Sequence, residues 1–236
     1  MAMNDKPALA LLSGLLCDAA IWQDVADDLG DVAQVTIIDF PGFDSIPAMA
    51  DKVLATMPER FWLAGHSMGG RVALEVLRRA PDRVEKLVLL DTGIHPTGAH
   101  EPATRGKLVD LANREGVEAL VEPWLIPMMG EAAVNDPAIL LAMTAMIARQ
   151  TPASFAGQIK ALLDRPDTDA ALDLAKRIPT LLIVGREDKW ASVAQHEEIS
   201  ARLDGAPLVV IEQAGHMAPA ERPKDVAEAM RGFLSA

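Results

Sequence analysis

The chain has 236 residues, of which 50% are hydrophobic and 24% charged, so it can bury a substantial core, and its composition does not indicate disorder. Its formal net charge of −12 argues against a general affinity for nucleic acid or for anionic membranes. The single cysteine excludes an internal disulfide and fits a reducing compartment, so we expect a cytoplasmic protein. No apolar run reaches the roughly 18 residues of a membrane-spanning helix.

The first apolar stretch, "ALALLSGLLCDAA" at residues 8–20, resembles the apolar part of an export signal, but the residues around it do not fit one. The residues before it carry one Lys and one Asp, so there is no positively charged leader. The two residues before Cys17 are Leu15 and Leu16, which are too large for a cleavage site. A buried strand over residues 8–12 with a turn at Ser13-Gly14 is the better interpretation.

Along the chain, short runs rich in Val, Ile and Leu alternate with longer helical patterns. The expected strands are residues 8–12, 32–38, 61–64, 86–90, 180–184 and 207–211. The expected helices are residues 19–29, 47–57, 68–80, 192–203 and 224–234. Nearly continuous apolar strands that alternate with helices predict a doubly wound α/β fold, in which a mostly parallel sheet carries helices on both faces.

The alternation stops between residues 93 and 178, where helical patterns separated by prolines replace the strands. An all-helical insertion between two strands of one sheet is most simply a cap over one edge of that sheet. We therefore expect a core made of residues 1–92 and 179–236, with a helical cap of residues 93–178 inserted in it.

A G-x-S-x-G pattern, Gly65-His66-Ser67-Met68-Gly69, follows the third expected strand and opens a helix. A tight strand-to-helix turn of this kind strains the serine backbone and lifts its hydroxyl above the sheet, and the small glycines allow the turn to close. The pattern predicts that Ser67 is a nucleophile.

A serine hydroxyl needs a base within hydrogen-bond distance and a third group that orients the base. His216 follows the last expected strand, on the sheet edge where Ser67 is expected, so it is the preferred base. His95 could reach the rim of the same site. The other three histidines are less suitable: His66 adjoins Ser67 on the turn, His100 lies near the start of the cap, and His196 lies within a helical pattern.

Two carboxylates end strands at this edge and could orient the histidine. Asp188 follows the strand at 180–184, and Asp91 follows the strand at 86–90. The chain order serine, acid, histidine holds for both. Asp188 is preferred and Asp91 is the reserve, while Glu187 is expected to be a solvated loop charge.

The motifs "GHSMGG", "VGREDKW", "AGHMAPAERP" and "DFPGFD" together resemble the α/β-hydrolase superfamily over the whole chain. The resemblance implies a triad of Ser67, Asp188 and His216. It also implies an oxyanion hole formed by the backbone N–H groups of Leu15 and Met68, because Gly14 aligns with the glycine of the family's His-Gly turn. Two features depart from the family. Ser13 replaces the usual histidine, and about six strands are expected instead of eight.

Because the nucleophile is serine and not aspartate, the resemblance favours acyl chemistry on a small-molecule ester, thioester or lactone. We expect a carboxylesterase-like serine hydrolase for small to medium, largely apolar acyl substrates, with no metal or organic cofactor. Cys17 is expected to be a small buried apolar residue. Seven apolar side chains are candidates for the substrate pocket. They are Trp22, Trp124, Met128, Met129, Met143, Met146 and Trp190.

Two alternatives remain open. The turn that carries Ser67 also resembles that of the 2-succinyl-6-hydroxy-2,4-cyclohexadiene-1-carboxylate (SHCHC) synthases of menaquinone biosynthesis. These lyases use the same triad to eliminate pyruvate. In them, a basic residue that matches Arg71 helps to hold the substrate carboxylates. The expected cap contains more acidic than basic residues, so we expect Arg71 to be a solvated helix charge instead. A non-catalytic receptor or scaffold is disfavoured because all three triad residues are present.

Overall fold

The computed structural model describes residues 6–236, whose centre is a sheet of six parallel strands in the order β2-β1-β3-β4-β5-β6. The strands are β1 (Ala8–Leu12), β2 (Gln34–Ile38), β3 (Phe61–His66), β4 (Val84–Leu90), β5 (Thr180–Gly185) and β6 (Leu208–Ile211). The predicted α/β fold with about six parallel strands is therefore confirmed. Residues 1–5, on which the argument against an export signal partly depends, lie outside the described residues.

Helices connect the strands and fill the long insertion between β4 and β5. They are α1 (Gln23–Leu29), α2 (Ile46–Thr56), α3 (Met68–Arg79), α4 (Glu101–Glu115), α5 (Ile126–Met128), α6 (Glu131–Val134), α7 (Pro137–Ala148), α8 (Pro152–Leu163), α9 (Asp169–Ala175), α10 (Val193–Arg202), α11 (Ala218–Glu221) and α12 (Pro223–Leu234). Short 3₁₀ turns lie at Ala19–Ile21, Pro81–Arg83 and Val117–Leu120, and a π-helical turn lies at Val121–Leu125. Among residues 6–236, no helix has the length and hydropathy needed to cross a bilayer.

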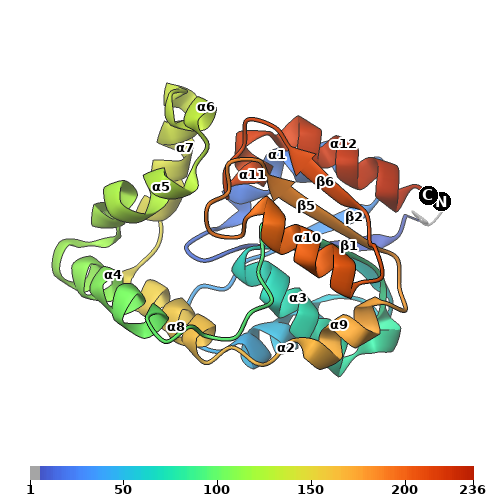
Figure 1. Ribbon diagram of the computed structural model, residues 1–236. Coiled ribbons are helices and arrows are strands. Elements are labelled where there is room, and N and C mark those ends of the chain that lie inside the picture. Colours follow the sequence, from blue (N-terminus) through green and yellow to red (C-terminus); the bar gives the residue numbers. More distant parts are fainter. Residues whose placement is uncertain (1–5) are drawn as a thin grey trace.

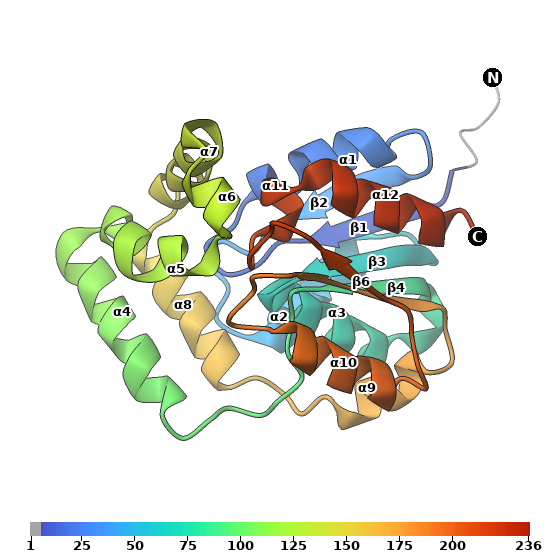
Figure 2. The same cartoon turned by 45° about the horizontal axis from the view of Figure 1, so that its top comes forward.

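The sheet is buried on both faces. Helices α1 and α12 pack on one side, and α2, α3, α9 and α10 pack on the other (Figures 1 and 2). The strands β3 and β5 are buried over their whole length, whereas the edge strands β2 and β6 are partly exposed. This two-sided coverage explains why the central strands read as continuous apolar runs and not as alternating patterns.

Helices α4–α8 form a separate group at the carboxyl ends of the strands (Figures 1 and 2). We call residues 101–163, which contain them, the cap helices. As expected, no strand interrupts this described segment. Helix α9 instead packs against α3 on the core. The division into a core of residues 1–92 and 179–236 and a cap of residues 93–178 stays a prediction.

Candidate active site

Ser67 occupies the sharp turn between β3 and α3. Its backbone has φ 54° and ψ −117°, a strained conformation for a residue with a side chain. A Cβ atom on Gly65 would collide with the backbone carbonyl of Gly69, so glycine is required where the strand and the helix cross. The turn presents Ser67 at the carboxyl edge of the sheet, between β1 and β4.

The structure brings Ser67, His216 and Asp188 into one hydrogen-bonded series. The Nε2 atom of His216 lies 2.8 Å from the Ser67 hydroxyl oxygen. The Nδ1 atom of His216 lies 2.7 Å from Oδ2 of Asp188. These contacts fit a tautomer in which Nδ1 donates to Asp188 and Nε2 accepts from the Ser67 hydroxyl. The serine can thus pass its proton directly to the imidazole.

Asp188 is the ionised acid of this series. Its Oδ1 atom accepts hydrogen bonds from the N–H groups of Trp190 and Ala191, at 2.7 and 2.9 Å. Burial alone would raise the pKa of Asp188, but the charge and hydrogen bond of His216 and these two N–H donors outweigh it and lower that pKa. The carboxylate is therefore fixed in a position from which it can orient His216 and stabilise its protonated form.

Asp91, the reserve acid, is completely buried in a different role. Its Oδ1 atom accepts from the N–H of Gly185 at 2.8 Å, and its Oδ2 atom has no hydrogen-bond partner among the described residues. Burial first, and then the neighbouring charge of Asp188, raise the pKa of Asp91 well above its ordinary value. Two adjacent buried carboxyl groups cannot both ionise readily, so Asp91 is the one that keeps its proton.

This assignment predicts how Asp91→Asn affects stability. In the unfolded chain Asp91 ionises near its ordinary pKa of 3.8, whereas in the fold the raised pKa keeps it neutral to higher pH. The wild type therefore loses stability as the pH rises above about 4, until the raised pKa is reached. An asparagine is neutral throughout and still accepts from Gly185, so its advantage over the wild type should grow as the pH rises from about 4 toward the raised pKa of Asp91.

Urea unfolding across this pH range measures the effect. The control is Asp24→Asn, at an exposed position of α1, for which no such trend is expected. A stability difference between Asp91→Asn and the wild type that stays constant with pH would show that Asp91 is ionised in the fold.

Leu15 and Met68 both line the cavity beside Ser67. Met68 is the first residue of α3, so its N–H has no intrahelical acceptor. The N–H of Leu15 makes no hydrogen bond to any described residue. The Leu15 loop is held by Gln158 of α8, whose side chain accepts from the N–H of Leu16 at 2.9 Å and donates to the carbonyl of Phe40 at 3.0 Å. No local pattern in the sequence predicted that Gln158 holds this loop in place.

The two unusual residues of the Leu15 loop are both buried. Ser13, which replaces the family's histidine, donates from its hydroxyl to the carbonyl of Asp18 at 3.3 Å. Burial raises the pKa of Cys17 to about 12, so its thiol stays protonated. Cys17 is thus a buried small side chain, not a nucleophile.

A cavity of about 330 Å³ opens at Ser67, between the core and the cap helices. The pocket candidates Trp124, Met128 and Trp190 line it, together with Leu108, Leu162 and Met217, which the sequence did not indicate. His95, expected at the rim, also lines it. Much of the wall near the nucleophile is therefore apolar.

Four pocket candidates do not line this cavity. Trp22 is completely buried under the sheet edge, where its indole N–H donates to the carbonyl of Leu12 at 3.1 Å. Met143 and Met146 are buried residues of α7, a helix that packs against neighbouring cap elements and the turn at Ala19–Ile21. Met129 is also buried and does not line the cavity. In these four residues, the apolar side chain serves packing.

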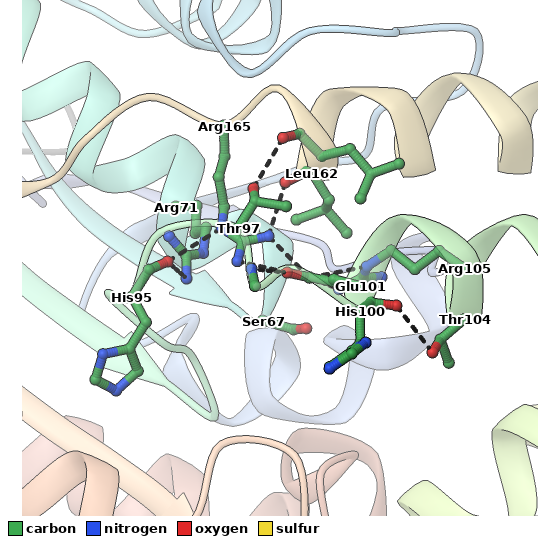
Figure 3. A network of polar contacts seen from close by, with 12 residues as sticks. Ser67, Arg71, His95, Thr97, His100, Glu101, Thr104, Arg105, Leu162 and Arg165 are labelled. Atoms are coloured by element: carbon green, nitrogen blue, oxygen red, sulfur yellow. Dashed lines mark hydrogen bonds and ion pairs between the residues drawn. The ribbon is translucent and has the colours of Figure 1, made fainter.

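Three arginines and one glutamate form a polar network at the other end of the cavity (Figure 3). Both carboxylate oxygens of Glu101 accept from the guanidinium of Arg165 at 2.8 Å, and Oε1 also accepts from Nε of Arg105 at 2.9 Å. These hydrogen bonds outweigh the effect of burial and lower the pKa of Glu101 to about 2. Arg71 donates to the carbonyl of His95 at 2.9 Å.

The expectation that Arg71 is a solvated charge is wrong. Burial first, and then repulsion by Arg165, lower its pKa to about 9, and its Nη1 atom is buried with no hydrogen-bond partner among the described residues. Three guanidinium groups face one carboxylate here, so this end of the cavity carries an excess of positive charge. Counting charged residues over the whole cap did not reveal this positive charge, because most of the acidic residues of the cap are exposed on its outer surface.

Comparison with known proteins identifies the family of this chain. The model of the alpha/beta hydrolase family matches residues 9–229. A pimeloyl-[acyl-carrier protein] methyl ester esterase of Nitrosomonas europaea is 27% identical, over 90% of each chain. A 2-succinyl-6-hydroxy-2,4-cyclohexadiene-1-carboxylate synthase of an Enterobacter species is 28% identical, over 97% of this chain and 92% of the synthase.

Among solved structures, a thermophilic esterase from Thermogutta terrifontis superimposes with a TM-score of 0.86 at 27% identity, over 97% of this chain and 89% of the esterase. The family match covers nearly the whole chain and includes β3, β5 and β6 together with the loops that carry Ser67, Asp188 and His216. The chain belongs to the alpha/beta hydrolase family.

Proposed function

We propose that this esterase-type hydrolase cleaves a small to medium, largely apolar carboxylic ester, or a related acyl substrate, through an acyl-enzyme on Ser67. The observation that carries the proposal is the hydrogen-bonded series of Ser67, His216 and Asp188 at the mouth of a 330 Å³ cavity. A pocket of this size matches a small acyl group and not a long lipid chain.

In the proposed reaction, the Ser67 oxygen attacks the ester carbonyl while Nε2 of His216 takes its proton. The carbonyl oxygen becomes an oxyanion that accepts hydrogen bonds from the N–H groups of Leu15 and Met68. His216 then gives the proton to the departing alcohol, and Asp188 stabilises the imidazolium in between. A water molecule, activated by the same histidine, releases the acid from Ser67.

The apolar side chains beside Ser67 support an uncharged ester. The cavity wall formed by Leu15, Trp124 and Met128 offers contact to an acyl chain but no partner for a charge. The Nitrosomonas relative is named for the hydrolysis of a methyl ester.

A series of p-nitrophenyl esters of rising acyl length, assayed beside lactones and acyl-thioesters, tests the proposal. We expect measurable hydrolysis of the acetate or butyrate, increasing with acyl length until the chain outgrows the cavity. Failure of the folded protein to hydrolyse any of these compounds would overturn the proposal.

A second candidate is a lyase of the SHCHC synthase type, which eliminates pyruvate with the same triad. The observation that favours it is the surplus of cationic groups at the far end of the cavity, where Arg71, Arg105 and Arg165 face only Glu101. A buried guanidinium is a strong partner for a carboxylate because both are removed from water. The Enterobacter relative is named as such a synthase.

Arg71→Gln distinguishes the two candidates. If the substrate is an uncharged ester, the substitution should change kcat/KM for p-nitrophenyl butyrate by less than about threefold. If the substrate is a polyanion, pyruvate release from the menaquinone-pathway substrate should be fast in the wild type and fall by about 100-fold or more in the variant, since a buried charge would lose its partner. Arg78→Gln, at an exposed position of the same helix α3, is the matched control.

A further inference from the structure

Glu221 is a buried carboxylate that the proposed reaction does not use. It ends the short helix α11, five residues after His216, and only 4% of it is exposed. Its Oε1 atom accepts from the N–H of Met217 at 3.0 Å, and its Oε2 atom accepts from the N–H groups of Gly215 and Gly130 at 3.0 and 2.8 Å. One side chain thus holds both neighbours of His216 and, through Gly130, the segment that follows α5.

The backbone reinforces this junction. The N–H of His216 itself donates to the carbonyl of Met128 at 2.7 Å. A Cβ atom on Gly215 would collide with the backbone of Met128, Met129 and Gly130, so the two segments touch backbone to backbone. Met128 also lines the substrate cavity. The position of the histidine and the position of one cavity wall are therefore fixed by the same contacts.

The hydrogen-bond pattern fits an ionised Glu221. Both oxygens accept and neither donates, which is the pattern of a carboxylate and not of a carboxylic acid. Burial raises the pKa of Glu221, and the three N–H donors and the attraction of His216 offset part of that rise.

We propose that Glu221 is a positioning residue, which holds the His216 loop and the cavity wall at Met128 as one unit and places a second negative charge near the imidazole. The inference builds on the proposed function, in which His216 is the base. A displacement of about 1 Å in a catalytic group can lower a rate by about 100-fold, so the three N–H bonds of Glu221 are sufficient to matter for turnover.

Charged and neutral groups surround His216 on several sides. Asp188 bonds to its ring, and the ring of His66 lies 5.4 Å away, centre to centre. Burial lowers the pKa of His66 to about 3 and also lowers that of His196, so both neighbours are neutral. Asp188 and Glu221 are therefore carboxylates that face His216 with negative charge.

The test compares Glu221→Gln and Glu221→Ala with Glu187→Gln and Glu187→Ala. Glu187 is the matched control because it accepts from the N–H of Glu131 on the same side of the cap at 2.7 Å but does not hold the His216 loop. The readouts are kcat and KM for p-nitrophenyl butyrate and the rate at which a fluorophosphonate inactivates the enzyme.

We expect Glu221→Ala to lower kcat and the inactivation rate by about 100-fold, and Glu221→Gln to recover part of the loss because its amide oxygen still accepts. The Glu187 variants should resemble the wild type in every readout.

Three results would overturn the inference. The first is a folded Glu221→Gln or Glu221→Ala protein with wild-type kcat and inactivation rate. The second is an equal loss in the Glu187 variants. The third is a Glu221→Gln protein that recovers none of the activity lost in a folded Glu221→Ala protein. If Glu221→Ala does not fold, Glu221→Gln alone decides between these outcomes. A wild type that neither hydrolyses the ester nor reacts with the fluorophosphonate would instead contradict the proposed function.

Discussion

Ser67→Ala is expected to lower kcat/KM for p-nitrophenyl butyrate by about 10⁶-fold, with no loss of secondary structure. The reason is that Ser67 is the one hydroxyl bonded to Nε2 of His216, so its removal leaves no oxygen to form the acyl-enzyme. Stopped-flow absorbance at low substrate concentration measures both the burst and the steady rate, and both should vanish.

Ser45→Ala is a suitable control for this variant. Ser45 caps α2 by accepting from the N–H of Ala48 at 3.3 Å, and it does not line the cavity. The control should keep its activity while losing some thermal stability. A Ser67→Ala enzyme that retains a few per cent of the wild-type rate would show that another group is the nucleophile.

Asp188→Asn is expected to lower kcat by about 10⁴-fold, whereas Asp91→Asn should lower it by less than about tenfold. An asparagine at position 188 can present its N–H₂ group to His216 and thereby stabilise the wrong tautomer, and it carries no charge to stabilise the imidazolium. At position 91 the amide replaces a carboxyl group that is already neutral and keeps the bond to Gly185.

Steady-state kinetics of both variants at pH 8, with folding checked by near-UV circular dichroism, measure the difference. The reverse order of effects, with Asp91→Asn the more damaging change, would place the orienting acid on the β4 end of the sheet and contradict the assignment of Asp188.

The fold and the positions of the three triad residues could be predicted because they depend on local sequence and on simple topology. The Ser67 turn is specified within five residues by the glycines around it. His216 and Asp188 each follow an apolar strand, and parallel strands bring their carboxyl ends to one edge. The protonation of Asp91, in contrast, depends on its complete burial beside Asp188, which no local pattern reveals.

The substrate end of the site could not be predicted, because it is assembled from distant segments of the chain. Arg71 lies in α3, the helix that follows Ser67. Glu101 and Arg105 belong to α4, and Arg165 follows α8. Apolar composition also could not distinguish side chains that line the cavity from side chains that only pack in the interior. Trp124 lines the cavity, whereas Met143 is buried and does not. Helical periodicity shows that a side chain is buried but not which neighbour buries it.

The most direct test of the account is peptide mapping by mass spectrometry after treatment of the protein with a fluorophosphonate. We expect a single covalent adduct on the peptide that contains Ser67, formed rapidly in the wild type and much more slowly in His216→Ala. No adduct at all, or an adduct on another residue that forms equally fast in both proteins, would contradict the assignment of Ser67 as the nucleophile activated by His216.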